Sequence, residues 1–180
     1  MTLEEMKEKI YTLIEEYNED SDDLTDDPDF AAKMNHVINQ IQNELARFKK
    51  IKGYVTREVS EGDTVELKDI DKNMYQLDIV KDVESELIGN TLLFKEDGTA
   101  RIYYFKYPKQ IDNNTSDNYK FDLSDDVLEI MPYGVAGDLL KSDVSSQYGA
   151  VYSKRYEELK QNLDPRYNLG SFYIEGGIDV

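Results

Sequence analysis

The sequence predicts an α+β protein: a helical bundle made of two N-terminal helices and a C-terminal helical hairpin, with a β-rich insertion and an extended C-terminal arm. Two observations support this prediction. Near both ends of the chain, apolar residues recur three or four apart, which is the spacing of one helix face. Between residues 54 and 108 the spacing becomes two, as in a strand. We therefore expect one domain over residues 1–165 and an arm over residues 166–180.

The N-terminal part predicts helices at residues 2–17 and 28–52. Thr2 and Glu5 have the spacing of a capping box, in which each side chain accepts a hydrogen bond from the other residue's backbone amide. In the second helix, Asp27-Pro28 supplies an N-cap followed by proline at the first helical position. Gly53 follows a basic last turn and is expected to end this helix.

The acidic run from Asp20 to Asp27 lies between these two helices. It lacks the central glycine and the terminal glutamate that a calcium-binding helix–loop–helix places at fixed positions. An exposed connecting loop is therefore the favoured interpretation, and a specific calcium site is the alternative. The single histidine, His36, lies beside the apolar stripe of the second helix and is expected at the surface.

We place the β insertion at residues 54–108. Glu61-Gly62-Asp63 indicates a turn. Leu92–Phe94 and Ala100–Tyr107 flank Asp97-Gly98, a strong signal for a tight turn, and this arrangement predicts a hairpin. Both faces of the second of these strands are largely apolar. That strand should therefore be central or covered on both sides.

The C-terminal hairpin is predicted from helices at residues 124–144 and 146–163. Ser124 is a suitable N-cap for the first of them. Pro132 lies inside the helical pattern, so the helix either kinks there or restarts with Pro132 in its first turn. Gly134 and Gly137 leave room for another backbone to come close.

The arm at residues 166–180 is apolar, aromatic and rich in glycine, with no helical period. Each large apolar side chain left in water costs about 1.5–3 kcal/mol. The segment is either a final strand folded back on the sheet or an arm that adds to a sheet of a neighbouring subunit or partner. The candidate contact residues are Leu169, Phe172, Tyr173, Ile174, Ile178 and Val180.

The composition argues against several classes of function. The chain has 38 acidic and 21 basic residues, a net charge of −17, which disfavours binding to nucleic acid or to an anionic membrane. It has no cysteine, one histidine and no glycine-rich phosphate loop, so we expect no catalysis, no metal and no cofactor. The first residues are acidic, unlike a signal peptide, and no apolar run approaches the ~20 residues of a membrane span. The expected location is the cytoplasm.

Three parts of the sequence resemble phage head-to-tail adaptor (connector) proteins. The first is LSDDVLEIMPYGVAGDLL at residues 123–140, followed by YSKRYEELK at residues 152–160. The second is the aromatic strand YYFKYP at residues 103–108, and the third is EGGI at residues 175–178.

The resemblance implies a non-enzymatic virion protein at the head–tail junction, present in the host cytoplasm during assembly. Adaptors of this family form a ring of about a dozen copies that docks on the portal protein. A stopper or tail protein binds on the other side, and DNA passes through without specific binding. Four tyrosines are candidates for packing between subunits: Tyr133, Tyr148, Tyr152 and Tyr156.

The strong negative charge would suit such a channel if acidic residues such as Asp20 to Asp27, Glu157 and Glu158 line it. The alternative function is an acidic cytoplasmic binding module or inhibitor that engages a basic partner, including an acidic mimic of nucleic acid. Binding of that kind would be sensitive to salt.

Overall fold

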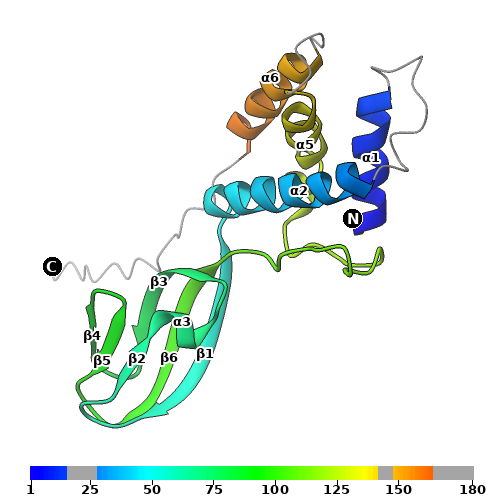
Figure 1. The fold of residues 1–180 in the computed structure, drawn as a ribbon. Coiled ribbons are helices and arrows are strands. Elements are labelled where there is room, and N and C mark those ends of the chain that lie inside the picture. The colour runs from blue at the N-terminus through cyan, green and yellow to red at the C-terminus, as the bar shows by residue number, and fades with distance from the viewer. Residues whose placement is uncertain (16–27, 142–147, 164–180) are drawn as a thin grey trace, which may run out of the picture.

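The structure, a computed structural model, describes residues 1–15, 28–141 and 148–163. It is α+β, with most of its helices in one half, and two three-stranded antiparallel sheets and the short helix α3 in the other (Figure 1). The predicted fold class, a helical bundle with a β-rich insertion, is wrong. Helix α2 crosses α1 and α5 instead of running alongside them (Figure 1), and the β half has a hydrophobic core of its own.

The helical half contains two long N-terminal helices and three that follow the β half. Their bounds are α1 Leu3–Glu15, α2 Pro28–Phe48, α4 Asp125–Leu128, α5 Met131–Leu140 and α6 Tyr148–Gln161. The capping box at the start of α1 is confirmed. The Thr2 amide donates to Glu5 Oε2 at 2.8 Å, and the Glu5 amide donates to Thr2 Oγ1 at 3.2 Å.

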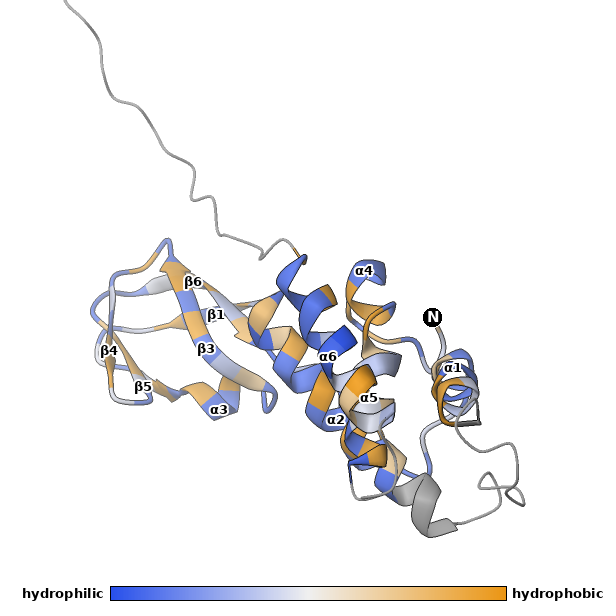
Figure 2. Cartoon of the chain, turned by 90° about the horizontal axis from the view of Figure 1, so that it is seen from above, coloured by the Kyte–Doolittle hydropathy of each residue, from blue (hydrophilic) through white to orange (hydrophobic). Residues whose placement is uncertain are grey.

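Helix α5 is the centre of the helical half, because α1, α2 and α6 all pack against it. It is largely apolar (Figure 2), and Met131, Val135 and Ala136 are fully buried. Of the two alternatives for Pro132, the structure shows the restart. The short α4 ends before Glu129, and α5 begins at Met131 with Pro132 in its first turn, where a missing amide hydrogen breaks no helical bond.

The contact between α5 and α6 depends on small residues. A Cβ atom added at Gly137 would lie 2.9 Å from the Ser153 amide nitrogen and 3.2 Å from its Cα. A Cβ at Gly149 would meet the Leu140 backbone at 3.1 Å. The two helices therefore touch backbone to backbone, and the prediction that the α5 glycines permit close approach is confirmed for Gly137.

A polar face of α2 holds the segment that connects the β half to α4. The Asn39 side chain donates to the Ile111 carbonyl at 2.8 Å and accepts from the Ile111 amide at 2.9 Å. The buried Gln42 donates to Asn39 Oδ1 and to the Lys109 carbonyl. Further along the segment, the Leu3 amide donates to the Tyr119 carbonyl, so the connection is fastened at both ends.

The β half contains six strands and the short helix α3 at Leu67–Ile70. The strands are β1 Ile51–Val59, β2 Thr64–Glu66, β3 Met74–Lys81, β4 Ser85–Ile88, β5 Thr91–Phe94 and β6 Gly98–Lys106. One sheet has the order β1-β6-β3 and the other β2-β5-β4. The prediction that the aromatic strand is central is confirmed, since β6 lies between β1 and β3.

The predicted hairpin between β5 and β6 is wrong, because the turn at Asp97-Gly98 joins strands of different sheets. A hairpin would place the apolar residues of both strands next to each other in one sheet. Instead, Leu92 and Phe94 of β5 meet Ala100 and Ile102 of β6 in one buried cluster between the sheets. The same cluster contains Val59, Val65 and Val83.

The second predicted helix extends too far, because α2 ends at Phe48 and β1 begins at Ile51. Gly53 is therefore a strand residue opposite Tyr104 of β6. A Cβ there would lie 2.6 Å from the Tyr104 ring, whose hydroxyl donates to Asp71 Oδ2 at 3.0 Å. Burial, followed by this hydrogen bond, raises the pKa of Tyr104 to about 12.

Candidate interaction surfaces

Within residues 1–15, 28–141 and 148–163 no group of three or more His, Asp or Glu side chains is placed to hold a metal ion. The calcium alternative at Asp20 to Asp27 lies outside the described residues. His36 is exposed on α2, as expected. None of the described helices is both long enough and apolar enough to cross a membrane.

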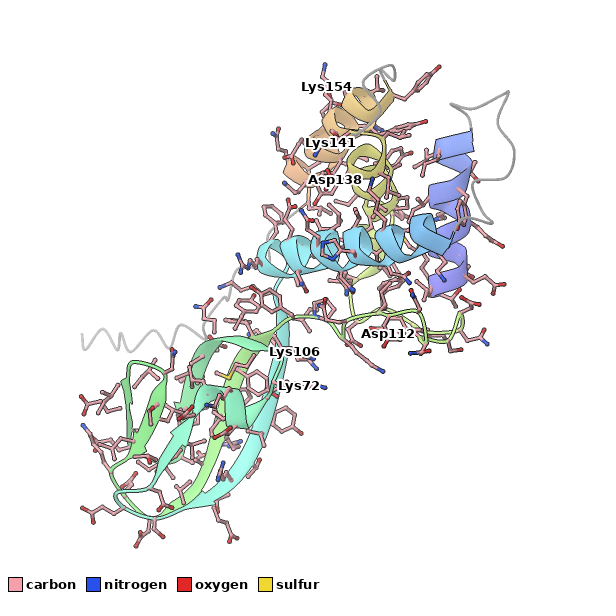
Figure 3. The ribbon with its side chains drawn as sticks, viewed as in Figure 1. Lys72, Lys106, Asp112, Asp138, Lys141 and Lys154 are labelled. Atoms are coloured by element: carbon pink, nitrogen blue, oxygen red, sulfur yellow. The ribbon has the colours of Figure 1, made fainter. Side chains whose placement is uncertain are left out.

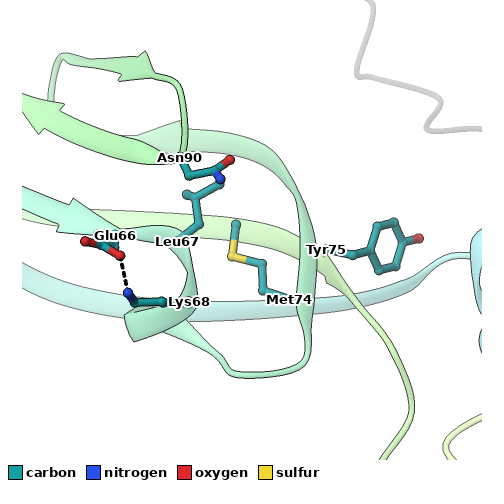
Figure 4. Close-up of a pocket in the computed structure, with 6 residues that line it drawn as sticks. All are labelled: Glu66, Leu67, Lys68, Met74, Tyr75 and Asn90. Carbon is teal, nitrogen blue, oxygen red and sulfur yellow. Dashed lines mark ion pairs between the residues drawn. The ribbon is translucent and has the colours of Figure 1, made fainter.

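A pocket of about 420 Å³ lies beside α3 (Figure 4). Its lining residues are Glu66, Leu67, Lys68, Met74, Tyr75 and Asn90. Lys68 and Glu66 form an ion pair, and the hydrogen bond from Lys68 to Glu66 raises the pKa of Lys68. Lys68 therefore stays protonated at neutral pH, which is the wrong state for a general base.

The most distinctive exposed surface is the outer face of the β1-β6-β3 sheet. Tyr54, Tyr103 and Ile79 occupy one row across the three strands, and the Tyr54 and Tyr103 rings stack at 6.0 Å. Tyr54 is 69% exposed and Ile79 47% exposed. Large apolar side chains gathered at the surface are typical of a contact site.

Basic side chains surround this row. Lys81 Nζ lies 5.4 Å from the Tyr103 ring centroid, and Lys50 Nζ lies 4.4 Å from that of Phe105. Such cation–π contacts are stabilising, and they hold the ammonium groups over the sheet. We call this surface the aromatic–basic face and define it as Tyr54, Ile79, Tyr103, Lys50, Lys52, Lys81 and Arg101; Phe105 is buried beneath Lys50.

The sequence around this face has an unusual distribution of charge. Residues 45–57 and 98–111, which include β6 and all but the last two residues of β1, contain eight of the chain's 21 basic residues and none of its 38 acidic residues. Glu58 of β1 lies just outside the first stretch. Acidic partners come from β3 and the residue after it. Lys52 lies 3.9 Å from Asp78, and Arg101 forms a forked ion pair with Asp82. The Arg101 hydrogen bond holds the pKa of Asp82 below its usual value.

A second feature of the surface is an acidic depression of about 450 Å³ in the helical half, between α1 and α4. It is lined by Met1, Glu5, Glu8, Lys9, Asp125, Leu128 and Glu129. Four of these residues carry carboxylates, whereas Lys9 and the N-terminus of Met1 carry ammonium groups, so the lining has a net negative charge. Buried Leu128 and half-buried Met1 add an apolar part to the lining.

The four tyrosines proposed for subunit packing lie on α5 and α6 with very different exposure. Tyr152 and Tyr156 are 8% and 4% exposed and belong to the helical core. The Tyr152 hydroxyl donates to the Leu13 carbonyl at 2.8 Å. Tyr133 is half-buried, whereas Tyr148 is 45% exposed. Tyr148 is therefore the most accessible of the four to a neighbour, together with Val151, which is 56% exposed.

Burial, followed by the nearby carboxylate of Glu44, raises the pKa of Tyr156 well above its usual value. The folded state therefore favours the neutral phenol. Its contribution to stability is complete below the ordinary pKa of about 10 and is lost as the pH rises toward the folded-state pKa. We expect urea denaturation to show a larger fall in stability between pH 8 and pH 11 for the wild type than for Tyr156→Phe. An equal fall in both proteins would contradict the burial of this hydroxyl.

The arm residues Leu169, Phe172, Tyr173, Ile174, Ile178 and Val180 lie outside the described residues. No model of a known protein family matches the chain, and no curated protein sequence is significantly similar to it. The aromatic–basic face was not anticipated from the sequence. Its signal was present, however, in the two long stretches that contain basic and aromatic residues without any acidic residue.

Proposed function

We propose that this protein is a structural adaptor of a tailed phage, which forms a ring on the portal and connects the head to the tail. The observation that carries the proposal is the presence of exposed apolar side chains in both halves of the chain. Tyr54, Ile79, Leu87 and Ile88 are exposed in the β half, and Tyr148 and Val151 on α6. A protein that joins several neighbours needs several separate contact surfaces.

The residues that resemble adaptors also lie together in space. Residues 123–140 form α4 and α5, and residues 152–160 lie in α6, which packs on α5 through its glycines. The pattern of small and apolar residues in this segment is thus the pattern needed for the α5–α6 contact. These residues therefore form one structural unit in this chain, and under the proposal this unit is the part shared with adaptors.

In this proposal the partners are the portal protein, other copies of the chain and a stopper or tail protein, and the role involves no chemical reaction. The protein would be made in the host cytoplasm and end in the virion at the head–tail junction. DNA would pass through the ring without specific binding. Glu157 and Glu158 are exposed on α6, as lining the channel would require, although Glu157 pairs with Lys160 and Glu158 lies near Lys154 and Arg155.

The alternative, an acidic module that binds a basic partner, is favoured by the acidic depression alone. The two functions differ in their expected response to salt. Docking of a basic protein into an exposed carboxylate cluster should weaken steeply as the salt concentration rises. An adaptor that docks through apolar residues of its arm should remain bound to the portal at high salt.

Binding to portal rings tests the proposal. We expect the full-length protein to co-sediment with purified portal rings of the same phage or prophage in low and high salt. A variant that lacks residues 169–180 should keep the circular dichroism spectrum and melting temperature of the folded domain. It should no longer co-sediment with the portal rings. If the truncated chain unfolds, the arm belongs to the core. If neither the full-length nor the truncated protein binds the portal, the adaptor proposal is wrong.

A further inference from the structure

The two charged surfaces are complementary, and they lie in different halves of the same chain (Figure 1). The aromatic–basic face is on the β half, and the acidic depression is in the helical half, between α1 and α4. We propose that the aromatic–basic face of one copy binds the acidic depression of a second copy. This inference rests on the proposed ring-forming function and assigns the surfaces that join neighbouring subunits.

Charge selects the second copy as the occupant. Residues 45–57 and 98–111 carry eight basic residues, so the other 13 basic residues share the rest of the chain with all 38 acidic residues. A second copy therefore carries an excess of acidic residues outside these stretches, and its depression gathers four of them. The net charge of −17 opposes the approach of a second copy as well as of a nucleic acid, so the charge complementarity is local to these two surfaces. A nucleic acid would also be attracted to the lysines, and it is the other outcome of the experiments below.

The apolar parts of the two surfaces also correspond. Tyr54 projects from the sheet with 69% of its surface exposed, beside the exposed Ile79. The depression of about 450 Å³ has room for an aromatic side chain, and its apolar lining comes mainly from Met1, since Leu128 is only 2% exposed. Aromatic side chains that enter a pocket of the partner are common anchors at the centre of a protein interface.

The contact is head-to-tail, because the two surfaces are different patches of the same chain. Contacts of this kind repeat from one copy to the next and close into a ring when the rotation per subunit permits. Each subunit would then use both of its surfaces. Tyr148 and Val151, on α6, are not required for this contact and stay accessible to another partner.

The first experiment locates the contact in the unmodified protein. Equal amounts of ¹⁴N- and ¹⁵N-labelled chain are mixed at low ionic strength and treated with a carbodiimide, which joins amines to carboxylates in direct contact. We expect mixed-isotope crosslinks from Lys52 or Lys81 to Glu5, Glu8, Asp125 or Glu129. Mixed-isotope crosslinks from these lysines to other carboxylates, or crosslinks only within one chain, would overturn the assignment.

The second experiment is a charge exchange followed by sedimentation. Lys81→Glu alone and Glu8→Lys alone should each weaken self-association at least about tenfold, whereas an equimolar mixture of the two variants should associate again. Lys154→Glu makes the same charge change on α6 (Figure 3) and should have no effect. Far-UV circular dichroism verifies that each variant is folded.

The outcomes separate this inference from the adaptor proposal. A wild-type chain that stays monomeric at low salt up to about 1 mM, a concentration sufficient for weak contacts, would overturn the subunit contact. Self-association that is as strong in Lys81→Glu and Glu8→Lys as in the wild type would also overturn it. Binding of a DNA oligonucleotide that Lys81→Glu abolishes, without self-association, would assign the face to nucleic acid. Portal binding is measured in a separate experiment. Its result tests the proposed adaptor function and does not test the contact between subunits.

Discussion

Replacement of Phe94 by alanine is expected to reduce the free energy of unfolding by about 3–5 kcal/mol, the usual range for a buried phenylalanine. Phe94 is 0% exposed and lies in the apolar cluster between the two sheets. Its backbone also closes the turn before β2, since its amide donates to the Asp63 carbonyl and its carbonyl accepts from Gly62. With the backbone in place, the loss comes from the removed ring and the cavity it leaves.

Leu87→Ala is the matched control, because Leu87 lies in the neighbouring strand β4 and is 46% exposed. Its loss should stay below about 1 kcal/mol, as is usual for exposed positions. Both values come from urea denaturation followed by circular dichroism. Equal effects of the two substitutions would contradict a core that lies between the sheets.

Replacement of Gly137 by valine should have the second large effect, a loss of about 3 kcal/mol, which is the upper part of the range for overpacking. The added Cβ would lie 2.7 Å from Ser153 Oγ and 2.9 Å from the Ser153 amide nitrogen. A side chain could turn aside, but the backbone nitrogen of α6 cannot. The helices would have to move apart, and this would loosen the packing of Tyr152 and Tyr156 as well.

Ala150→Val provides the control, since Ala150 is exposed on α6 and its substitution adds a β-branched side chain at the surface. The helix propensity of valine predicts a cost below about 1 kcal/mol. Thermal unfolding of the three proteins measures the difference. If Gly137→Val were as stable as Ala150→Val, the backbone contact between α5 and α6 would not exist.

Local features of this fold were predictable from the sequence because they depend on neighbouring residues. The capping box needs only Thr2 and Glu5, and the restart of α5 is one of two outcomes that Pro132 allows. The central position of β6 followed from the apolar character of both its faces. In each case a few adjacent residues determine the local backbone structure.

The arrangement of these elements was not predictable in the same way. The turn at Asp97-Gly98 is compatible with a hairpin and also with a crossing between two sheets, and only the packing of Phe94 against Ile102 decides between them. The same limit applies to the fold class. Helical periodicity shows that α1, α2 and α5 each have an apolar face, but it does not show that α2 crosses the other two.

The candidate contact surfaces depend on more than the sequence pattern. The resemblance directed attention to the arm and to four tyrosines, two of which, Tyr152 and Tyr156, serve the core of their own chain. The aromatic–basic face depends on the register that places Tyr54 beside Tyr103 and Ile79. Strand pairing brings these distant positions together, and pairing across a sheet cannot be read from periodicity.

The central claim is that this protein forms a ring at the portal, and negative-stain electron microscopy tests it most directly. Purified portal rings from the same phage or prophage are mixed with an excess of the protein and imaged, beside portal rings alone. The adaptor proposal predicts additional ring-shaped density at one end of the portal. Bare portals at a high concentration of a folded protein would contradict it and would direct the search toward a basic partner.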